Sequence, residues 1–268
     1  DAIVSDELNH ASIIDGARLS KATIKVFPHK DVNAARRILK DLPADQKKIL
    51  ITDGVFSMDG DLGAVPELCA LAEEYNAIMM VDDAHASGVF GKNGSGTVDH
   101  FRCHGRVDIQ VGTLSKAIGV LGGYVAGSRT LIEFLYHRAR PFLFSTSHPP
   151  AVTAACLAAL DILETEPQWI EKLWDNTRFF KAGLDKLGFN TGLSQSPITP
   201  VIVGQAATAA RMSDALFERG VFAQSIGFPT VARDKARLRT IVAATHTRED
   251  LQYALDTFAV VGRELGVI

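Results

Sequence analysis

Short apolar segments alternate with helical patterns over roughly the first half of the chain. The apolar segments cover residues 2–5, 22–27, 48–52, 77–82, 107–112 and 123–126, and helical patterns lie between them at 31–42 and 65–75. Such alternation is typical of βαβ units, so the sequence predicts a mostly parallel sheet with helices on both faces. The last segment follows Lys116 too closely for a helical crossover. We therefore expect that strand to run antiparallel to its neighbour.

A second region is dominated by helices and then by short mixed elements. Helical patterns occupy residues 129–138, 150–164 and 167–187. After Gly188 the order becomes strand, helix, strand, strand, helix, at residues 200–203, 206–220, 221–224, 238–243 and 247–265. This order predicts a small C-terminal α+β domain. We expect a large domain over 1–165, a linking helix over 166–188 and the small domain over 189–268.

Composition limits the class of protein and its partners. The 268 residues are 47% hydrophobic and 22% charged, which suits a globular protein with a large core. A net charge of −3 with interleaved acids and bases predicts neither a nucleic-acid nor a membrane surface. Three cysteines without CxxC spacing favour reduced thiols, and we find no signal peptide or long apolar span. The expected location is the cytoplasm.

Lys116 is the most informative single residue. It follows the apolar strand pattern that ends at Val111, within the Gly-rich turn Gly112-Thr113-Leu114-Ser115-Lys116, and is a candidate Schiff-base nucleophile. Another strand pattern ends at Asp82, with His85 three residues later. Ligands of open parallel sheets bind at the carboxyl ends of the strands. A lysine, an acid for a pyridine nitrogen and an imidazole together suggest pyridoxal phosphate.

Other interpretations of these residues remain open at this point. A lysine after a strand is usually a solvated surface charge. Asp82 and His85 could form a metal site with His100 or His104, but the ligand spacing is not that of a known metal motif. The glycines Gly91, Gly94 and Gly96 are better explained as turn residues than as a dinucleotide fingerprint, because we expect no helix after them.

Three more polar positions are candidates with ordinary alternatives. Ser57 lies in a polar turn after the strand pattern that ends near Thr52, and could simply be a turn residue. His10 opens a helix and could lie on a bound ring or only cap that helix. Arg237 and Arg239 alternate about Leu238, so both extend from one strand face. A guanidinium there could bind a carboxylate, although an exposed strand would look the same.

Taken together, these stretches resemble the α-oxoamine synthase family of fold-type I pyridoxal-phosphate enzymes, over the whole chain. The resemblance is carried by Leu8-Asn9-His10-Ala11-Ser12, Gly54-Val55-Phe56-Ser57-Met58-Asp59-Gly60, Val81-Asp82-Asp83-Ala84-His85, Thr113-Leu114-Ser115-Lys116, Arg140-Pro141-Phe142-Leu143-Phe144-Ser145-Thr146, Arg237-Leu238-Arg239 and Ala243-Ala244-Thr245-His246. The resemblance implies that Lys116 is the Schiff-base lysine and that Asp82 pairs with the pyridine nitrogen. It also implies that His85 and Ser57 approach the ring hydroxyl, and that His10 stacks on the ring.

The resemblance assigns roles to the remaining candidates as well. Thr113 is expected to contact the phosphate. Phe144, Ser145 and Thr146 match a segment that reaches the phosphate of a neighbouring subunit, which implies a homodimer with shared sites. Arg239 matches the residue that holds the carboxylate of the amino-acid substrate.

The resemblance also implies the substrates. It is nearest to the members that condense glycine with acetyl-CoA, the 2-amino-3-ketobutyrate coenzyme A ligases or glycine C-acetyltransferases, in which Lys116, His85 and His10 are the expected catalytic residues. The alternative is the decarboxylating reaction of alanine with a pimeloyl thioester, which gives 8-amino-7-oxononanoate, or dual specificity. Family members carry a further N-terminal segment with a phosphate-binding loop, which we expect to be missing here. A non-catalytic truncated homologue is therefore a third possibility.

Overall fold

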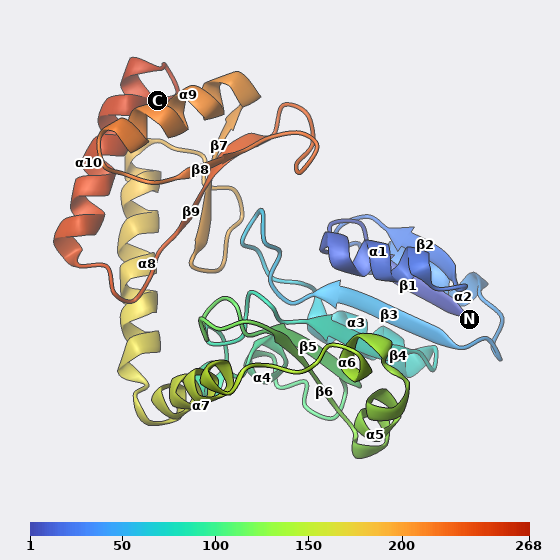
Figure 1. Cartoon of the computed structure of the whole chain (residues 1–268). Coiled ribbons are helices and arrows are strands. Elements are labelled where there is room, and N and C mark those ends of the chain that lie inside the picture. Colours follow the sequence, from blue (N-terminus) through green and yellow to red (C-terminus); the bar gives the residue numbers. More distant parts are fainter. The chain divides into compact units, whose positions relative to one another are not determined.

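The computed structural model describes residues 1–268 and divides into two compact units (Figure 1). The first comprises residues 1–56 and 63–167, and the second residues 57–62 and 168–268. No helix is both long and apolar enough to cross a membrane. The domain boundaries expected above stay a prediction, and each compact unit is described here by itself.

A six-stranded sheet forms the centre of the first unit. Its strands follow the order β2-β1-β3-β4-β5-β6, and all neighbouring pairs are parallel except β5 and β6. The antiparallel last strand predicted from the short connection after Lys116 is therefore confirmed. The strands are β1 (Ala2–Asp6), β2 (Thr23–Phe27), β3 (Lys48–Asp53), β4 (Ile78–Asp82), β5 (Ile109–Thr113) and β6 (Gly123–Gly127).

Helices cover both faces of this sheet because apolar side chains alternate along its strands. One buried cluster joins Val4, Leu50 and Met79 to helices α2 (Val32–Asp41) and α3 (Val65–Glu74). The neighbouring residues Ile3 and Ile51 pack with helix α1 (Ala11–Leu19) in a separate cluster. The predicted α/β architecture with two covered faces is confirmed. The other helical elements of this unit are η1 (Lys92–Gly94), α4 (Thr97–His100), α5 (Arg129–Arg138), α6 (Arg140–Leu143) and α7 (Pro150–Thr165).

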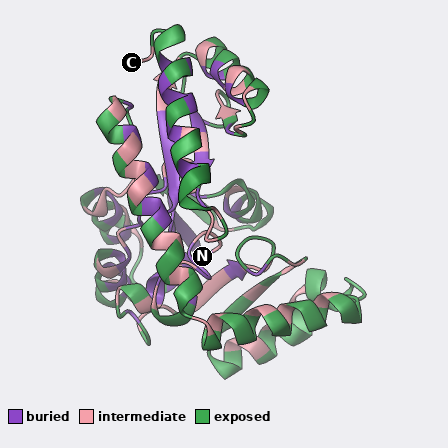
Figure 2. Cartoon of the chain, turned by 90° about the vertical axis from the view of Figure 1, so that its left-hand side faces the viewer, coloured by how far each residue is buried: buried purple, intermediate pink, exposed green.

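The second unit has its own sheet and its own core. The sheet has the order β7-β9-β8, with both pairs antiparallel. Helix side chains such as Phe180, Met212 and Phe258 pack around the fully buried Leu238. Figure 2 shows buried positions on the strands and exposed positions on the outward faces of the helices. The elements are α8 (Gln168–Leu187), β7 (Ile198–Gly204), α9 (Ala206–Glu218), β8 (Gln224–Ile226), β9 (Ala236–Ile241) and α10 (Arg248–Glu264).

Two local expectations from the sequence are wrong. The strand expected at residues 221–224 begins only at Gln224, because the Val221 N–H still donates to the Leu216 carbonyl at the end of α9 (2.9 Å). A one-turn helix, α4, does follow Gly96, although none was expected. A distant side chain holds it: the Thr97 N–H donates to the Asp83 carboxylate (2.9 Å). The contact of Thr97 with Asp83 joins residues 14 positions apart, so local sequence does not reveal it.

Candidate active site

Polar residues end four adjacent strands of the large sheet at the same edge. The last residues of β1, β3, β4 and β5 are Asp6, Asp53, Asp82 and Thr113. Asp53 and Asp82 are paired in the parallel ladder, and the Gly54 N–H donates to the Asp82 carbonyl (2.8 Å). Residues paired in a parallel ladder direct their side chains to the same face. The register therefore brings two carboxyl groups to one point of the sheet edge.

A pocket of about 240 Å³ opens at this edge. Its lining comes from the ends of β3, β4 and β5 and from the start of α1: His10, Ser12, Asp53, Val55, Asp82, Ala84, His85, Val111, Gly112, Thr113 and Lys116. The structure thus brings together Lys116, Asp82, His85, His10 and Thr113, all singled out from the sequence. Lys116 itself is exposed, whereas Asp82 is buried.

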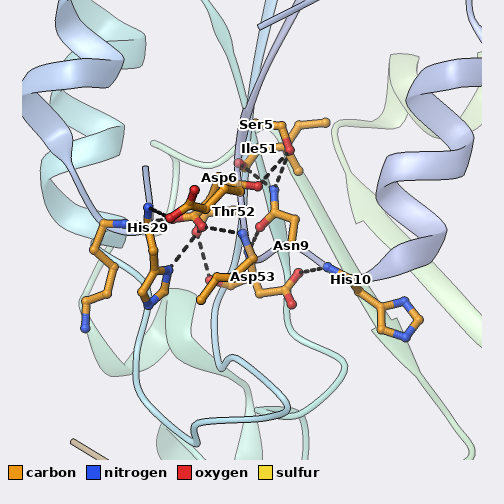
Figure 3. Close-up of polar contacts among 11 residues, drawn as sticks. Ser5, Asp6, Asn9, His10, His29, Ile51, Thr52 and Asp53 are labelled. Carbon is orange, nitrogen blue, oxygen red and sulfur yellow. Dashed lines mark hydrogen bonds and ion pairs between the residues drawn. The ribbon is translucent and has the colours of Figure 1, made fainter. Parts of the chain in front are cut away.

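Asn9 fixes the position of His10 through a set of buried hydrogen bonds between β1 and β3 (Figure 3). Its amide nitrogen donates to the Ser5 hydroxyl (2.9 Å) and to the Ile51 carbonyl (3.0 Å). Its side-chain oxygen accepts the Asp53 N–H (2.8 Å). The next residue, His10, caps helix α1, and its backbone N–H donates to the Asp53 carboxylate at 3.5 Å. The His10 ring is directed away from this network (Figure 3).

The His10 ring is oriented by its own helix cap. Its Nδ1 accepts the Ser12 N–H (3.2 Å) and lies 2.8 Å from the Ser12 hydroxyl oxygen. Because Nδ1 is the acceptor for a backbone donor, the proton of the neutral ring belongs on Nε2. The helix-cap alternative for His10 is confirmed, and the stacking of its ring on a bound ring stays a prediction for a residue that lines the pocket.

Asp53 is a second buried acid of the pocket that the sequence analysis did not select. Its side chain is only 4% exposed. Burial, followed by the charge of Asp82, raises the pKa of Asp53 well above that of an exposed aspartate, and Asp6 adds to this effect. The His10 N–H and the Lys116 charge act in the opposite direction. Asp53 also closes an apolar strand, as Asp82 does, and that parallel is the signal that could have identified it.

Asp83 and Tyr124 are outside the pocket lining and form hydrogen bonds between the segments that carry it. The fully buried Asp83 carboxylate accepts hydrogen bonds from the Thr97 N–H (2.9 Å) and from Gln110 Nε2 (2.8 Å). Burial raises the pKa of Asp83, and these donors oppose the shift. The Tyr124 hydroxyl lies 2.7 Å from the Ser87 hydroxyl. These contacts tie β5, β6 and the segment that carries His85 to one another.

The turn that carries Lys116 is closed by hydroxyl groups. Thr113 Oγ1 lies 2.8 Å from Ser115 Oγ and accepts the Ser115 N–H (3.3 Å). The Leu114 N–H donates to the Gly122 carbonyl (2.9 Å), so the turn returns directly into β6. The lysine therefore lies on a short, internally bonded turn beside the Thr113 hydroxyl.

Two of the predicted site residues, Ser57 and Arg239, belong to the second unit. Within that unit Arg239 donates to the Ser57 carbonyl (3.3 Å), and burial lowers the pKa of Arg239. The structure gives Arg239 no carboxylate partner, whereas the neighbouring Arg237 forms a partly buried ion pair with Asp59. The two arginines do extend from one strand face, as their alternation predicts, and only Arg239 is available for an outside carboxylate.

The predicted subunit-contact residues lie in an exposed loop after α6. Phe144, Ser145 and Thr146 are all exposed and do not line the pocket. Thr146 and Ser147 both have positive φ angles, +61° and +67°. Non-glycine residues in this conformation are uncommon and concentrate at functional segments. No group of three or more potential metal ligands comes together in the structure.

Comparison with known proteins decides the family. The profile described as "Aminotransferase class I and II" matches residues 1–258. An 8-amino-7-oxononanoate synthase of Symbiobacterium thermophilum is 62% identical over 269 residues, covering 100% of this chain and 69% of that protein. The 8-amino-7-oxononanoate synthase 1 of Bacillus subtilis is 56% identical, covering 100% of this chain and 68% of that protein. The chain belongs to the α-oxoamine synthase family of fold-type I pyridoxal-phosphate enzymes.

Solved structures agree with the assignment of this chain to the α-oxoamine synthase family. A serine palmitoyltransferase described with a pyridoxal-phosphate internal aldimine has a TM-score of 0.96 at 34% identity, covering 100% of this chain and 68% of that one. The crystal structure of 8-amino-7-oxononanoate synthase from Francisella tularensis has a TM-score of 0.82 at 30% identity, covering 98% and 76%. The fold-type I architecture expected from the sequence is confirmed.

The residues of the pocket fit the cofactor of the α-oxoamine synthases. The buried Asp82 carboxyl group suits a ring that carries a positive charge. Lys116 supplies an exposed amine for a carbonyl carbon, and Thr113 supplies a hydroxyl for an anion. Two imidazoles, His10 and His85, complete a lining suited to an aromatic, zwitterionic ligand.

Proposed function

We propose that this α-oxoamine synthase is an 8-amino-7-oxononanoate synthase, which joins alanine to a pimeloyl thioester with release of carbon dioxide and coenzyme A or another thiol. The single observation that carries this proposal is the shared name of relatives that are 56–62% identical over the whole chain. These names favour the alanine alternative over the expected reaction of glycine with acetyl-CoA.

The proposed chemistry assigns the cofactor to the pocket of the first unit. Pyridoxal phosphate, when bound, supplies an aldehyde for an amine and a ring that accepts electrons from the substrate Cα. Lys116 would provide the amine that holds the cofactor, and Asp82 would keep a proton on the ring nitrogen. Thr113 would donate a hydroxyl to the phosphate, and His85 and Ser57 would lie by the ring hydroxyl. His10, held by its Ser12 contacts, would lie on the ring face.

Lys116 and the imidazoles would handle the protons of the reaction. Once alanine has replaced the Lys116 amine at the cofactor, this amine is free to remove a proton from the substrate Cα and to return one after the acyl transfer. Lys116 lies among Thr113, Asp82 and His85 around one pocket, so little movement separates these two tasks. His85 or His10 can donate a hydrogen bond to the acyl carbonyl, where negative charge develops.

Substrate binding would use groups outside the pocket lining. Arg239 would hold the alanine carboxylate, which its lack of an acidic partner in the second unit supports. Phe144, Ser145 and Thr146 would reach the phosphate in a neighbouring subunit of a homodimer. Their exposed, strained loop supports that assignment.

The proposal is tested by comparing substrates with the full-length protein. We expect kcat/KM for alanine with pimeloyl-CoA to exceed that for glycine with acetyl-CoA by about a hundredfold or more, as for discrimination that involves several methylene groups. Product masses and released carbon dioxide identify the reaction. Faster turnover of glycine with acetyl-CoA would support instead the main reaction expected from the sequence. Absence of both reactions in a protein that binds pyridoxal phosphate would contradict both.

A further inference from the structure

Asp53 has no place in the proposed chemistry, yet it is the more deeply buried of the two pocket acids. We propose that Asp53 is a positioning residue for Asp82: the pair of carboxyl groups carries one proton, held on Asp53, so that the pair presents a single negative charge to the pocket. The role of this single negative charge in holding the cofactor rests on the proposed function, in which one carboxylate pairs with one protonated pyridine nitrogen. The protonation of Asp53 is a property of the protein alone.

The strand register places the two acids side by side. Asp53 and Asp82 are direct partners in the parallel ladder of β3 and β4, and both line the pocket. They are 4% and 9% exposed. Carboxyl groups on paired and poorly solvated residues repel each other when both are ionised, which favours a proton on one of them.

Differences in hydrogen bonding decide which acid keeps the proton. Asp82 Oδ1 accepts the Ala84 N–H at 2.8 Å, a contact that stabilises negative charge on that oxygen. Asp53 accepts only the more distant His10 N–H, at 3.5 Å, and is the more buried of the two. The structure therefore favours charge on Asp82 and the proton on Asp53.

Asn9 holds Asp53 in this position. The Asn9 side chain accepts the Asp53 N–H and donates to the Ile51 carbonyl, so it fixes the end of β3 from both sides (Figure 3). The residue after Asn9 is His10, whose backbone N–H donates to the Asp53 carboxylate. These bonds hold the Asp53 backbone beside β4, and the His10 N–H is the one of them that reaches the Asp53 carboxylate.

The other charged groups around Asp53 do not cancel the pairing. Asp82 on β4 and Asp6 on β1 raise the pKa of Asp53, in addition to the dominant effect of burial. Asp6 is itself bonded to the His29 ring (3.1 Å). Lys116 acts in the opposite direction from the turn after β5. His10 and His85 line the same pocket.

The test is a carboxyl ¹³C NMR titration of the cofactor-free, full-length protein labelled at its aspartates. Asp53→Asn and Asp82→Asn assign the two signals, and the exposed Asp15 serves as the internal control. We expect the Asp53 signal to remain in its protonated position well above the pH range in which an exposed aspartate ionises. In Asp82→Asn the Asp53 midpoint should move to lower pH. Titration of Asp53 together with Asp15, or an unchanged midpoint in Asp82→Asn, would overturn the proposal.

Cofactor binding gives a second, independent readout. Pyridoxal-phosphate affinity, measured by absorbance near neutral pH, should fall at least about tenfold more in Asp82→Asn than in Asp53→Asn, because asparagine imitates only the neutral acid. Equal losses would mean that both acids act as anions and would also overturn the proposal. Loss of the alanine reaction in a protein with the expected titration would contradict the proposed function and leave this inference intact.

Discussion

At the residue scale, the buried Asp53 makes the stability of the protein depend on pH. Burial and the Asp82 charge raise the pKa of Asp53 in the folded state, so the unfolded chain releases this proton at lower pH. Below the ordinary aspartate pKa both states are protonated, and Asp53 costs no stability. As pH rises from the ordinary aspartate pKa toward the pKa of Asp53 in the folded state, the free energy of unfolding falls, because only the unfolded state gains from ionisation.

Replacing Asp53 by asparagine should remove this cost. We expect Asp53→Asn to raise the free energy of unfolding of the cofactor-free protein by about 1–3 kcal/mol near pH 7–8, with the gain shrinking toward zero near pH 4. Urea unfolding at several pH values measures it, and Asp15→Asn on the exposed face of α1 is the control. A gain that does not change with pH would show that the charge of Asp53 is not responsible.

The sequence predicted several pocket residues but not the partner of Asp82. Lys116, Asp82 and Thr113 could be selected because each follows or ends an apolar strand. Asp53 also ends one, but its segment resembled an ordinary turn. Its importance depends on the register with Asp82 and on the Asn9 hydrogen bonds, and both join segments distant in the chain.

At the scale of elements, β5 and β6 meet at a position where only glycine fits. Gly112 is paired with Tyr124 in the antiparallel ladder, and a Cβ at Gly112 would overlap the Tyr124 ring. The ring cannot move freely, because its hydroxyl lies 2.7 Å from that of Ser87. The close approach of these two strands is what places Thr113 and Lys116 at the pocket.

Two glycine-to-alanine changes should therefore have opposite effects. Gly112→Ala should destabilise the protein by about 1–3 kcal/mol through overpacking. Gly16→Ala, in helix α1 with no atom within 4 Å of the added Cβ, should stabilise it by about 0.5–1 kcal/mol. Thermal unfolding compares both with the parent. A neutral Gly112→Ala would show that the Tyr124 ring is not fixed.

Secondary structure was predictable where a strong local period existed. The six strands of the large sheet and the antiparallel direction of β6 followed from apolar segments and from one short connection. The start of β8 did not, because Val221 still bonds back to Leu216 at the end of α9. The one-turn helix α4 did not, because its Thr97 N–H bonds to Asp83 in the loop after β4.

At the scale of the whole molecule, the first unit exposes apolar side chains that suit an interface. Helices α5, α6 and α7 contain no buried residue, and Phe134, Phe142 and Phe144 are 58%, 58% and 75% exposed. Large exposed apolar patches mark interaction surfaces. We propose that a second copy covers part of this surface, in keeping with the expected shared sites. Assembly of this kind is not encoded in any local pattern of one chain.

Subunit complementation tests the shared site. Lys116→Ala and the double change Ser145→Ala with Thr146→Ala should each be inactive. After the subunits exchange in an equal mixture, half of the dimers are mixed and each has one intact site, so about a quarter of wild-type activity should return. Lys116→Ala mixed with Asp82→Asn is the control, since both residues line one pocket of one subunit. Equal recovery in both mixtures, or in neither, would contradict a site shared in this way.

We propose that Lys116 carries the cofactor of this α-oxoamine synthase. The most direct measurement is borohydride reduction of the full-length protein with pyridoxal phosphate, followed by mass mapping of its peptides. We expect one stable adduct, on the peptide that contains Lys116, and none in Lys116→Ala. An equal yield in Lys116→Ala, or an adduct spread over surface lysines such as Lys92, would contradict the account.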